Sequence, residues 1–424
     1  MENQRNINNE HVKGRFTPII KKTLEVMAEK RLRIGSWQDS EKEPEDWSNA
    51  HKVCNAIQAF LTCHRILPEA FIRLPLDKKI LLDDLKYLLD CVRKDGFEPG
   101  AYVPVGGYEA IDYAADIMTT FLDFIRYATD IRLKDELLKE VEQVIDKAIS
   151  FLVDSVYEAP DGYRWAGSSI VASGKTVYSH VYFTCSAVNA LYYAVEHYKK
   201  LDSARIERLT QLIQGSHTWL SKRKSGERYY SDEKLTITQS TSALYNMDAL
   251  FSTWKLIKDS RIKDFAEQCL KDYYNFLKNS RSEFDLDIFY PALVRDAKAP
   301  VQIDDRTTIA NCLKVFCLGK TVLDKGDLID QAFLSFLSQL ANDVIDEMDP
   351  DENVWEKGHY LIYSNLRTIE GLLLFEKYGA HEEIEKFSVF DYREIVRAAL
   401  SSEAVMKAFI DEFRRLSGPR SEES

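Results

Sequence analysis

The chain has 424 residues, 45% of them hydrophobic and 12% aromatic, and a formal net charge of −12. This composition is ample for a large buried core, and the acidic balance excludes an electrostatically driven nucleic-acid-binding protein, since no stripe of Lys and Arg interrupts it. No uninterrupted apolar run of about 18 residues occurs, so a membrane span is not expected.

The N-terminal sequence MENQRNINNEHVKGR is polar and lacks the apolar segment of a signal peptide. The seven cysteines are scattered, and most lie within apolar helical patterns, which is typical of reduced core residues in a cytoplasmic protein. No CxxC pair is present, so no zinc site is expected. Neither GxGxxG nor the phosphate-loop pattern occurs, and no cofactor is expected.

In chain order, residues 1–17 are expected to be flexible, and Pro18 opens the first helix. A second helix follows Ser48 and runs to about Ile66. A third, strongly amphipathic helix ends at the turn signal Asp95-Gly96.

From that turn onward one unit repeats. An amphipathic helix ends, a turn with one or two aromatic residues follows, and a more apolar helix returns. The apolar helices are expected at residues 107–127, 176–197, 236–258, from about 304 to 319, and 359–378. The intervening helices each carry a single apolar stripe, as in residues 137–152.

Six such pairs, spaced by about 55 to 66 residues, cover almost the whole chain. An open solenoid would expose one side of the apolar helices, whose polar residues do not read as a continuous wet face. We therefore predict an all-α fold, an (α/α)6 toroid with six inner and six outer helices over residues 18–380. A further helix, residues 381–416, is expected to pack on the toroid, before a disordered tail, residues 417–424.

The turn-plus-aromatic links and the inner segments YSHVYFTCSAVNALYYA and ITQSTSALYNMDALF resemble, over about residues 18–380, the toroid domains of terpenoid cyclases and protein prenyltransferase β-subunits. The segment Gln302-Ile303-Asp304-Asp305-Arg306-Thr307 is similar to the Asp-x-Asp-Asp-Thr motif of class II terpene cyclases. Gln302 replaces the first aspartate, and Arg306 precedes the threonine. The resemblance implies a protonation-initiated cyclase or an isoprenoid-binding protein, with Asp304 as the acid and Asp305 as its neighbour.

Asp304 or Asp305 is equally well suited to cap the helix that follows. If the ring closes, the starts of the inner helices meet at one end, where their N–H groups favour anionic ligands and carboxylates. The candidate ligand-binding residues at this end are Glu109, Asp112, Tyr178, His180, Ser240, Arg306, His359, Tyr360 and Arg367.

Two alternatives stay open. A non-catalytic toroid would act as a scaffold for another protein, and a carbohydrate-active (α/α)6 enzyme would use paired carboxylates such as Glu109, Asp112 and Asp304. The cavity distinguishes these hypotheses. An apolar, aromatic-lined chamber with Asp304 at its wall favours an isoprenoid ligand, an open polar groove favours a glycan, and a filled or sealed ring favours a scaffold.

Overall fold

The computed structural model describes the backbone of residues 16–37, 50–97, 110–165, 168–170, 176–178, 180–225, 228–229, 238–281, 292–293, 305–322, 337–338, 341–342 and 361–378. All of these residues belong to one compact unit, Met1–Gly379. In this part of the chain no helix is long and apolar enough to cross a membrane. The predicted helix at residues 381–416 and the predicted tail lie outside the described residues, so the domain boundaries stay predictions.

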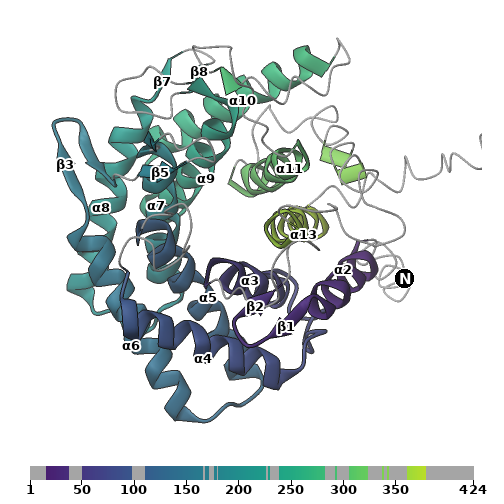
Figure 1. The fold of residues 1–424 in the computed structure, drawn as a ribbon. Helices are drawn as coiled ribbons and strands as arrows, with labels where there is room; N and C mark the ends of the chain where they lie inside the picture. Colours follow the sequence, from purple (N-terminus) through teal and green to yellow (C-terminus); the bar gives the residue numbers. More distant parts are fainter. Residues whose placement is uncertain are drawn as a thin grey trace, which may run out of the picture. The chain divides into compact units, whose positions relative to one another are not determined.

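The fold is all-α, an (α/α)6 toroid, as predicted (Figure 1). The inner ring consists of α3 (Ala50–Ile66), α5 (Ala110–Asp130), α7 (His180–His197), α9 (Ser240–Ile257), α11 (Asp305–Val322) and α13 (Leu361–Tyr378). The described outer helices are α2 (Thr17–Glu29), α4 (Lys78–Asp95), α6 (Asp135–Asp154), α8 (Ser203–Ser221) and α10 (Ser260–Arg281). Between α11 and α13, where the repeat predicts the sixth outer helix, only short helical pieces that include the buried Leu337 and Ala341 are described.

Each inner helix contacts the next one around the ring, and α13 contacts α3. This last contact closes the toroid and confirms the prediction that the first and last inner helices are neighbours. The backbone N–H groups of Phe16 and Thr17, at the start of α2, donate to the Glu376 carboxylate of α13. Thr17 Oγ1 donates to the same carboxylate at 2.7 Å. A side chain from the last inner helix therefore satisfies free N–H groups of the first outer helix.

The outer helices bury one stripe each. Asp77 caps α4 by accepting from the Lys79 N–H at 2.7 Å, and Gly96 ends the helix with a φ of +61°. In α6 the buried stripe is Val141, Val144, Ile145, Ala148, Ile149 and Leu152. Six methyl-bearing side chains at helical spacing explain why this helix lies against the inner ring, since most helical stability comes from such a packed face.

Short antiparallel ribbons join the helices in the described part of the chain. The pairs are β1–β2 (Arg31–Arg33, Ser36–Trp37), β3–β4 (Tyr157–Ala159, Gly162–Arg164), β5–β6 (Ser168–Ile170, Thr176–Tyr178), β7–β8 (Lys224–Ser225, Arg228–Tyr229) and β9–β10 (Thr238–Gln239, Ala292–Leu293). The expected helix starts at residues 176 and 236 are wrong, because residues 176–178 and 238–239 pair as strands. Their β-branched and aromatic residues favour that pairing.

The β3–β4 ribbon shows how a turn-plus-aromatic link is anchored. Gly162 has a φ of +133°, and a Cβ there would lie 2.2 Å from the Gly215 carbonyl oxygen of α8, so only glycine fits. Trp165 follows the ribbon, is fully buried, and donates its indole N–H to the Leu152 carbonyl at the end of α6 at 2.7 Å. The aromatic residue therefore ties the link to the preceding outer helix.

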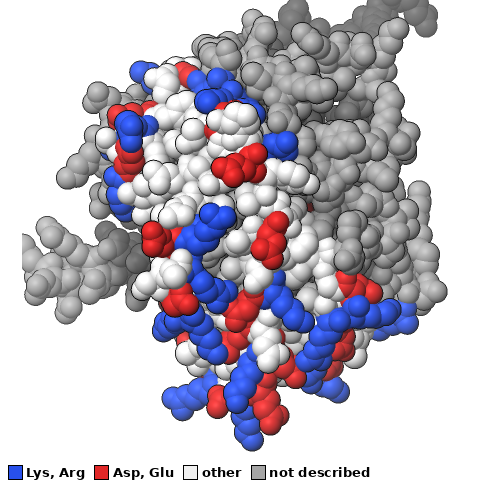
Figure 2. Space-filling model, turned by 90° about the vertical axis from the view of Figure 1, so that its left-hand side faces the viewer, with Lys and Arg blue, Asp and Glu red and all other residues white. Residues whose placement is uncertain are grey.

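Charges on the outer surface are mixed. Figure 2 shows the face at the left of Figure 1, where blue and red side chains lie side by side. Ion pairs also join neighbouring outer helices, including Arg205 of α8 with Asp146 of α6 and Arg93 of α4 with Glu140 of α6, both at 2.8 Å. This face offers no single-signed patch for a polyanion, in agreement with the composition.

Candidate functional site

A cavity of about 390 Å³ lies at the centre of the ring and is lined by residues of all six inner helices. On α5 the lining residues include Asp112, Asp116, Thr119 and Arg126, which are three, four or seven residues apart and so lie on one face of the helix. The same spacing holds on the other inner helices, with Tyr182, Ser186, Asn189, Tyr193 and His197 on α7 as the longest example. Each inner helix therefore presents a polar stripe to the cavity and an apolar surface to its neighbours.

The inner helices run in the same direction. Asp112 of α5 meets Tyr182 and Ser186 of α7, and eleven residues further along α5, Asp123 meets Tyr193 of α7. The Tyr182 ring also packs edge-on against the Tyr245 ring of α9, with centroids 4.9 Å apart. Residues near the helix starts therefore share one level of the cavity, and residues near the helix ends share another.

Asp112 lies on the first turn of α5 and is 2% exposed. The Tyr182 hydroxyl donates to its Oδ2 and the Ser186 hydroxyl to its Oδ1, each at 2.9 Å. Burial raises the pKa of Asp112, although these two hydroxyls and the charge of Arg367 oppose that shift. Because the hydroxyl donors are neutral, they offset the cost of burying a carboxylate only in part.

Asp116 follows Asp112 by one helical turn and lines the same cavity. Residues at i and i+4 of a helix have Cβ atoms about 5–6 Å apart. Two carboxyl groups from one helix therefore lie on the same wall, and a small polar molecule could reach both.

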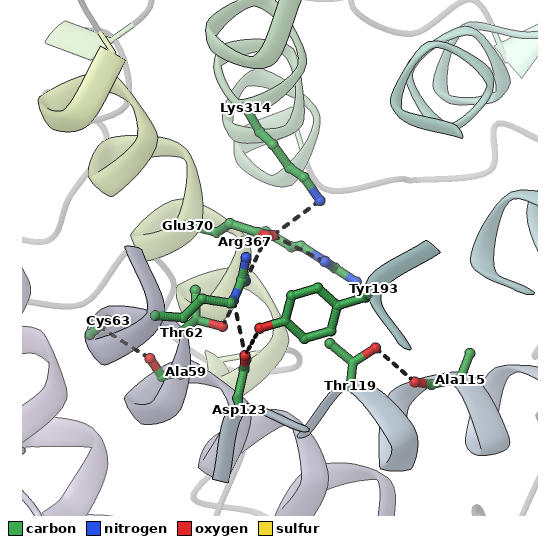
Figure 3. A network of polar contacts seen from close by, with 11 residues as sticks. Ala59, Thr62, Cys63, Ala115, Thr119, Asp123, Tyr193, Lys314, Arg367 and Glu370 are labelled. Carbon is green, nitrogen blue, oxygen red and sulfur yellow. Dashed lines mark hydrogen bonds and ion pairs between the residues drawn. The ribbon is translucent and has the colours of Figure 1, made fainter. Parts of the chain in front are cut away.

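Farther along the axis, buried ion pairs join four inner helices (Figure 3). Arg65 of α3 donates to Asp123 of α5 at 3.2 Å and to Glu370 of α13 at 3.4 Å, and the Tyr193 hydroxyl donates to the same Asp123. Lys314 of α11 lies 3.3 Å from the Glu370 carboxylate, which also accepts from Arg367 at 3.3 Å. This network links residues up to 305 positions apart in the chain.

The electrostatics of this network differ from those of Asp112. Burial alone would raise the pKa of Glu370, but Lys314, Arg367 and Arg65 together lower it to about 2. Burial likewise opposes the charge of Arg65, and the neighbouring Asp123 holds the Arg65 pKa above its ordinary value. Glu370 is therefore ionised at any physiological pH, surrounded by three cations.

Of the residues that the sequence analysis selected, the structure brings Asp112 and Arg367 together at the cavity wall. Asp305 and Arg306 are the first two residues of α11, Ser240 and His180 open α9 and α7, and Tyr178 ends β6. Their side chains are outside the described set, as are Glu109, Asp304, His359 and Tyr360 altogether. Their assignment to a site, including Asp304 and Asp305 as catalytic acids, stays a prediction.

Five residues of the cavity and its ion-pair network were not among the predicted site residues: Asp116, Asp123, Arg65, Lys314 and Glu370. A signal was present, because polar residues recur every three or four positions along otherwise apolar helices. The expectation that the inner helices lack a continuous polar face is wrong. The polar face is narrow and lines the closed cavity, which permits a closed ring without requiring fully apolar inner helices.

The nature of the cavity decides among the three functional hypotheses. Its described lining contains Asp112, Asp116, Asp248, Glu370 and six Lys or Arg residues, so it is not the apolar chamber that an isoprenoid ligand requires. The ring is also not filled by side chains, whereas the scaffold hypothesis predicted a filled ring. An open polar cavity is the outcome expected for a carbohydrate ligand.

No protein-family model matches this sequence, and no curated protein does so. Solved structures do match its fold. The GH76A α-1,6-mannanase from Salegentibacter sp. HEL1_6 is 11% identical with a TM-score of 0.56, over 85% of this chain and 98% of the mannanase. A D-mannose isomerase is 12% identical with a TM-score of 0.56, over 84% and 95% of the two chains.

An unsaturated glucuronyl hydrolase specific for heparin is 10% identical with a TM-score of 0.52, over 89% of this chain and 98% of the hydrolase. At these identities the likeness concerns the fold alone. The resemblance to terpenoid cyclases and prenyltransferases is therefore wrong as a family assignment. A short motif such as QIDDRT recurs in unrelated settings, whereas the full-length match is to (α/α)6 toroids that act on carbohydrates.

Proposed function

We propose that this protein is a carbohydrate-active enzyme that binds a sugar in the central cavity and uses the Asp112 carboxyl for acid–base chemistry. The observation that carries the proposal is Asp112 itself, a buried carboxyl with a raised pKa at the wall of an open polar cavity. A carboxyl whose pKa is raised by burial is a suitable proton donor near neutral pH, as in glycosidases generally.

The second carboxyl, Asp116, supports glycosidic-bond hydrolysis as the reaction. Glycosidases use two carboxyl groups, one to protonate the leaving oxygen and one to activate water or to attack the sugar carbon. In this proposal Asp112 protonates the glycosidic oxygen and Asp116 takes the second role. The helical spacing of these residues places both side chains on the same wall of the cavity, as two cooperating carboxyl groups require.

The activities of the structurally similar proteins support this assignment. Three of the matching structures are an α-1,6-mannanase, a glucuronyl hydrolase and a mannose isomerase. A variant of the mannanase with two consecutive aspartates replaced is described as inactive and was solved with α-1,6-mannotriose. Each of these statements concerns the matched protein, and the shared fold makes the same class of substrate the first to test here.

The direct test is to incubate the wild-type protein with a library of α- and β-linked oligosaccharides and to measure new reducing ends. Asp112→Asn should abolish product formation, because an amide cannot donate the proton. Asp154→Asn, at the exposed C-terminus of the outer helix α6, is the matched control and should keep full activity. Incorporation of solvent deuterium into free sugars, without new reducing ends, would point to isomerisation instead. Wild-type protein inert in both assays would overturn the proposal.

The compartment belongs to the same proposal. All seven cysteines are free thiols, and six of them are buried. Reduced core cysteines of this kind support a cytoplasmic enzyme, because secreted proteins with several cysteines usually pair them.

A further inference from the structure

The cavity has a second end, opposite Asp112, that is lined by basic residues. Arg126, Lys255 and Lys377 lie near the C-terminal ends of α5, α9 and α13 and line the cavity there. Asp112 and Arg126 are fourteen residues apart on one helix, which at 1.5 Å per residue places them about 21 Å apart along the axis. The basic end is therefore separate from the proposed proton donor.

These three cations lack acidic partners. Within the described residues, Arg126 and Lys255 form no ion pair, and Lys377 lies over the Tyr378 ring at 5.4 Å without an ion pair of its own. Glu196 of α7 attracts Lys255 without forming an ion pair with it, and the two other nearby carboxylates are already engaged. Asp123 accepts from Arg65 and Tyr193, and Asp248 is 3.0 Å from Lys314. The charge on the basic end is thus not neutralised by the protein itself.

The excess of positive charge in the cavity is unusual for this acidic chain. Six cations but only four carboxylates line the cavity within the part that the structure describes, whereas the whole chain has a net charge of −12. A positive cleft with low-dielectric walls in an acidic protein concentrates small anions and repels other acidic surfaces. Solubility does not require an excess of positive charge inside the cavity.

Cations at helix C-termini also have a structural explanation, because they complement the helix dipole. Lys255 goes beyond that explanation. It is only partly exposed, and burial lowers its pKa; the neighbouring Lys258 and Lys377 act in the same direction, and Asp248 and Glu196 oppose them. A lysine that lines a cavity where burial disfavours its charge is consistent with a ligand that restores the balance.

We propose that the basic end of the cavity, formed by Arg126, Lys255 and Lys377, is an anion-binding site that takes the oxyanion group of a ligand, a carboxylate, sulfate or phosphate. The guanidinium of Arg126 offers paired N–H donors that match such a group, and the two ammonium groups supply charge from the opposite walls. The site stands on binding alone and does not depend on the reaction proposed for Asp112.

The pKa of His197 can be used to detect a ligand at this site. It is the last residue of α7 and lines the same end of the cavity. Partial burial and the positive charges of Arg126 on α5 and Arg65 on α3 lower the pKa of His197 to about 4, while the Tyr193 ring of its own helix packs against it at 4.3 Å. A bound oxyanion would offset the charge of the two arginines and raise that pKa.

The test is calorimetric titration of the full-length protein at constant ionic strength with sodium phosphate, sodium sulfate and glucuronate, and with glucose as the neutral reference. Wild-type protein should bind at least one oxyanion and should not bind glucose at this site. The double variant Arg126→Met/Lys255→Met should bind roughly 10-fold or more weakly, since each removed cation forfeits a charge-assisted contact. Lys139→Met/Lys147→Met, an equal charge change on exposed positions of the outer helix α6, should bind as the wild type does.

Asp112→Asn should bind the oxyanion unchanged, so that failure of the proposed reaction and failure of this site are separate results. Binding of glucuronate without binding of inorganic phosphate or sulfate would identify an anionic sugar as the ligand, and binding of all three would identify a general oxyanion site. NMR titration of His197, assigned with His197→Gln, should show a raised pKa when the ligand is present. The absence of binding by any oxyanion, or equal affinity in the wild type and the double variant, would overturn the proposal.

Discussion

Two buried carboxyl groups of the same cavity, Asp112 and Glu370, differ in what surrounds them. Both are less than 10% exposed, so burial penalises the charge of each. Neutral hydroxyls of Tyr182 and Ser186 bind Asp112, and its pKa is raised. Three cations surround Glu370, and its pKa is lowered to about 2. Burial is common to both sites, and the neighbours therefore decide whether a carboxyl is available for proton transfer or fixed as a permanent charge.

This difference separates the level of the proposed proton donor from the level of the buried ion-pair network. Burial of Asp112 destabilises its ionised form and raises its pKa, a perturbation that is common among residues of functional sites. At the Glu370 level, Arg65, Asp123 and Lys314 tie four inner helices together across the axis. Substitution of one neighbour at a time tests whether these surroundings set the two pKa values.

The largest effect is expected for Asp112→Asn. Loss of a positioned general acid lowers the rate by about 10²–10⁴-fold. The raised pKa means that the ionised form is disfavoured in the folded state, so stability is lost as pH rises through the folded pKa, and an amide removes that loss. Thermal melts at pH 7 should therefore show no decrease for Asp112→Asn. A large decrease would place Asp112 with the structural residues instead.

The next largest effect is expected for Arg65→Met, now on stability. This change leaves Asp123 and Glu370 without their shared cation, and removal of one partner of a buried pair typically costs about 3–5 kcal/mol. Arg93→Met is the matched control. Its ion pairs with Asp90 and Glu140 are exposed, so about 1 kcal/mol or less is expected. Urea unfolding of both variants measures the difference, and equal losses would contradict a structural role for the network.

A third prediction concerns acid stability and Glu370→Gln. The folded pKa of Glu370 is below its ordinary value of 4.5, so its charge stabilises the folded state above that value. This contribution is lost as the pH falls from about 4.5 towards 2. Unfolding free energies measured across that window should fall less steeply for Glu370→Gln than for the wild type, after correction for the variant's lower stability at pH 7. Parallel curves would contradict the assignment.

The smallest effect is expected for Ser186→Ala. The Ser186 hydroxyl lowers the pKa of Asp112 by donating to it, so its removal should raise that pKa further. The limb of the pH–rate profile that reports the acid should then move to higher pH, with little change in the maximal rate. Thr119→Val, which removes a cavity hydroxyl that donates instead to the Ala115 carbonyl, should leave that limb in place. A shift of equal size in both variants would break the link between Ser186 and Asp112.

Much of the architecture followed from the sequence alone. The alternation of amphipathic and apolar helices predicted the (α/α)6 toroid, the identity of inner and outer helices, and the contact between the first and last inner helices. These features depend on local periodicity, and an apolar helix has to be covered on most sides wherever it occurs. Asp112 and Arg367 were selected as candidates on the same basis, since both lie within the first turns of predicted inner helices, and their role in binding stays a prediction.

The set of charged residues that meet at the cavity depends on the tertiary structure. Asp123 and Glu370 read as isolated polar residues on apolar helices, because their shared partner, Arg65, lies 58 and 305 positions away in the chain. The QIDDRT motif misled the functional assignment for the converse reason, as its chemistry depends on surroundings that six residues do not encode. Helical periodicity is a property of neighbours along the chain, whereas the pKa of a carboxyl depends on neighbours in space, and closure of the ring determines which residues those are.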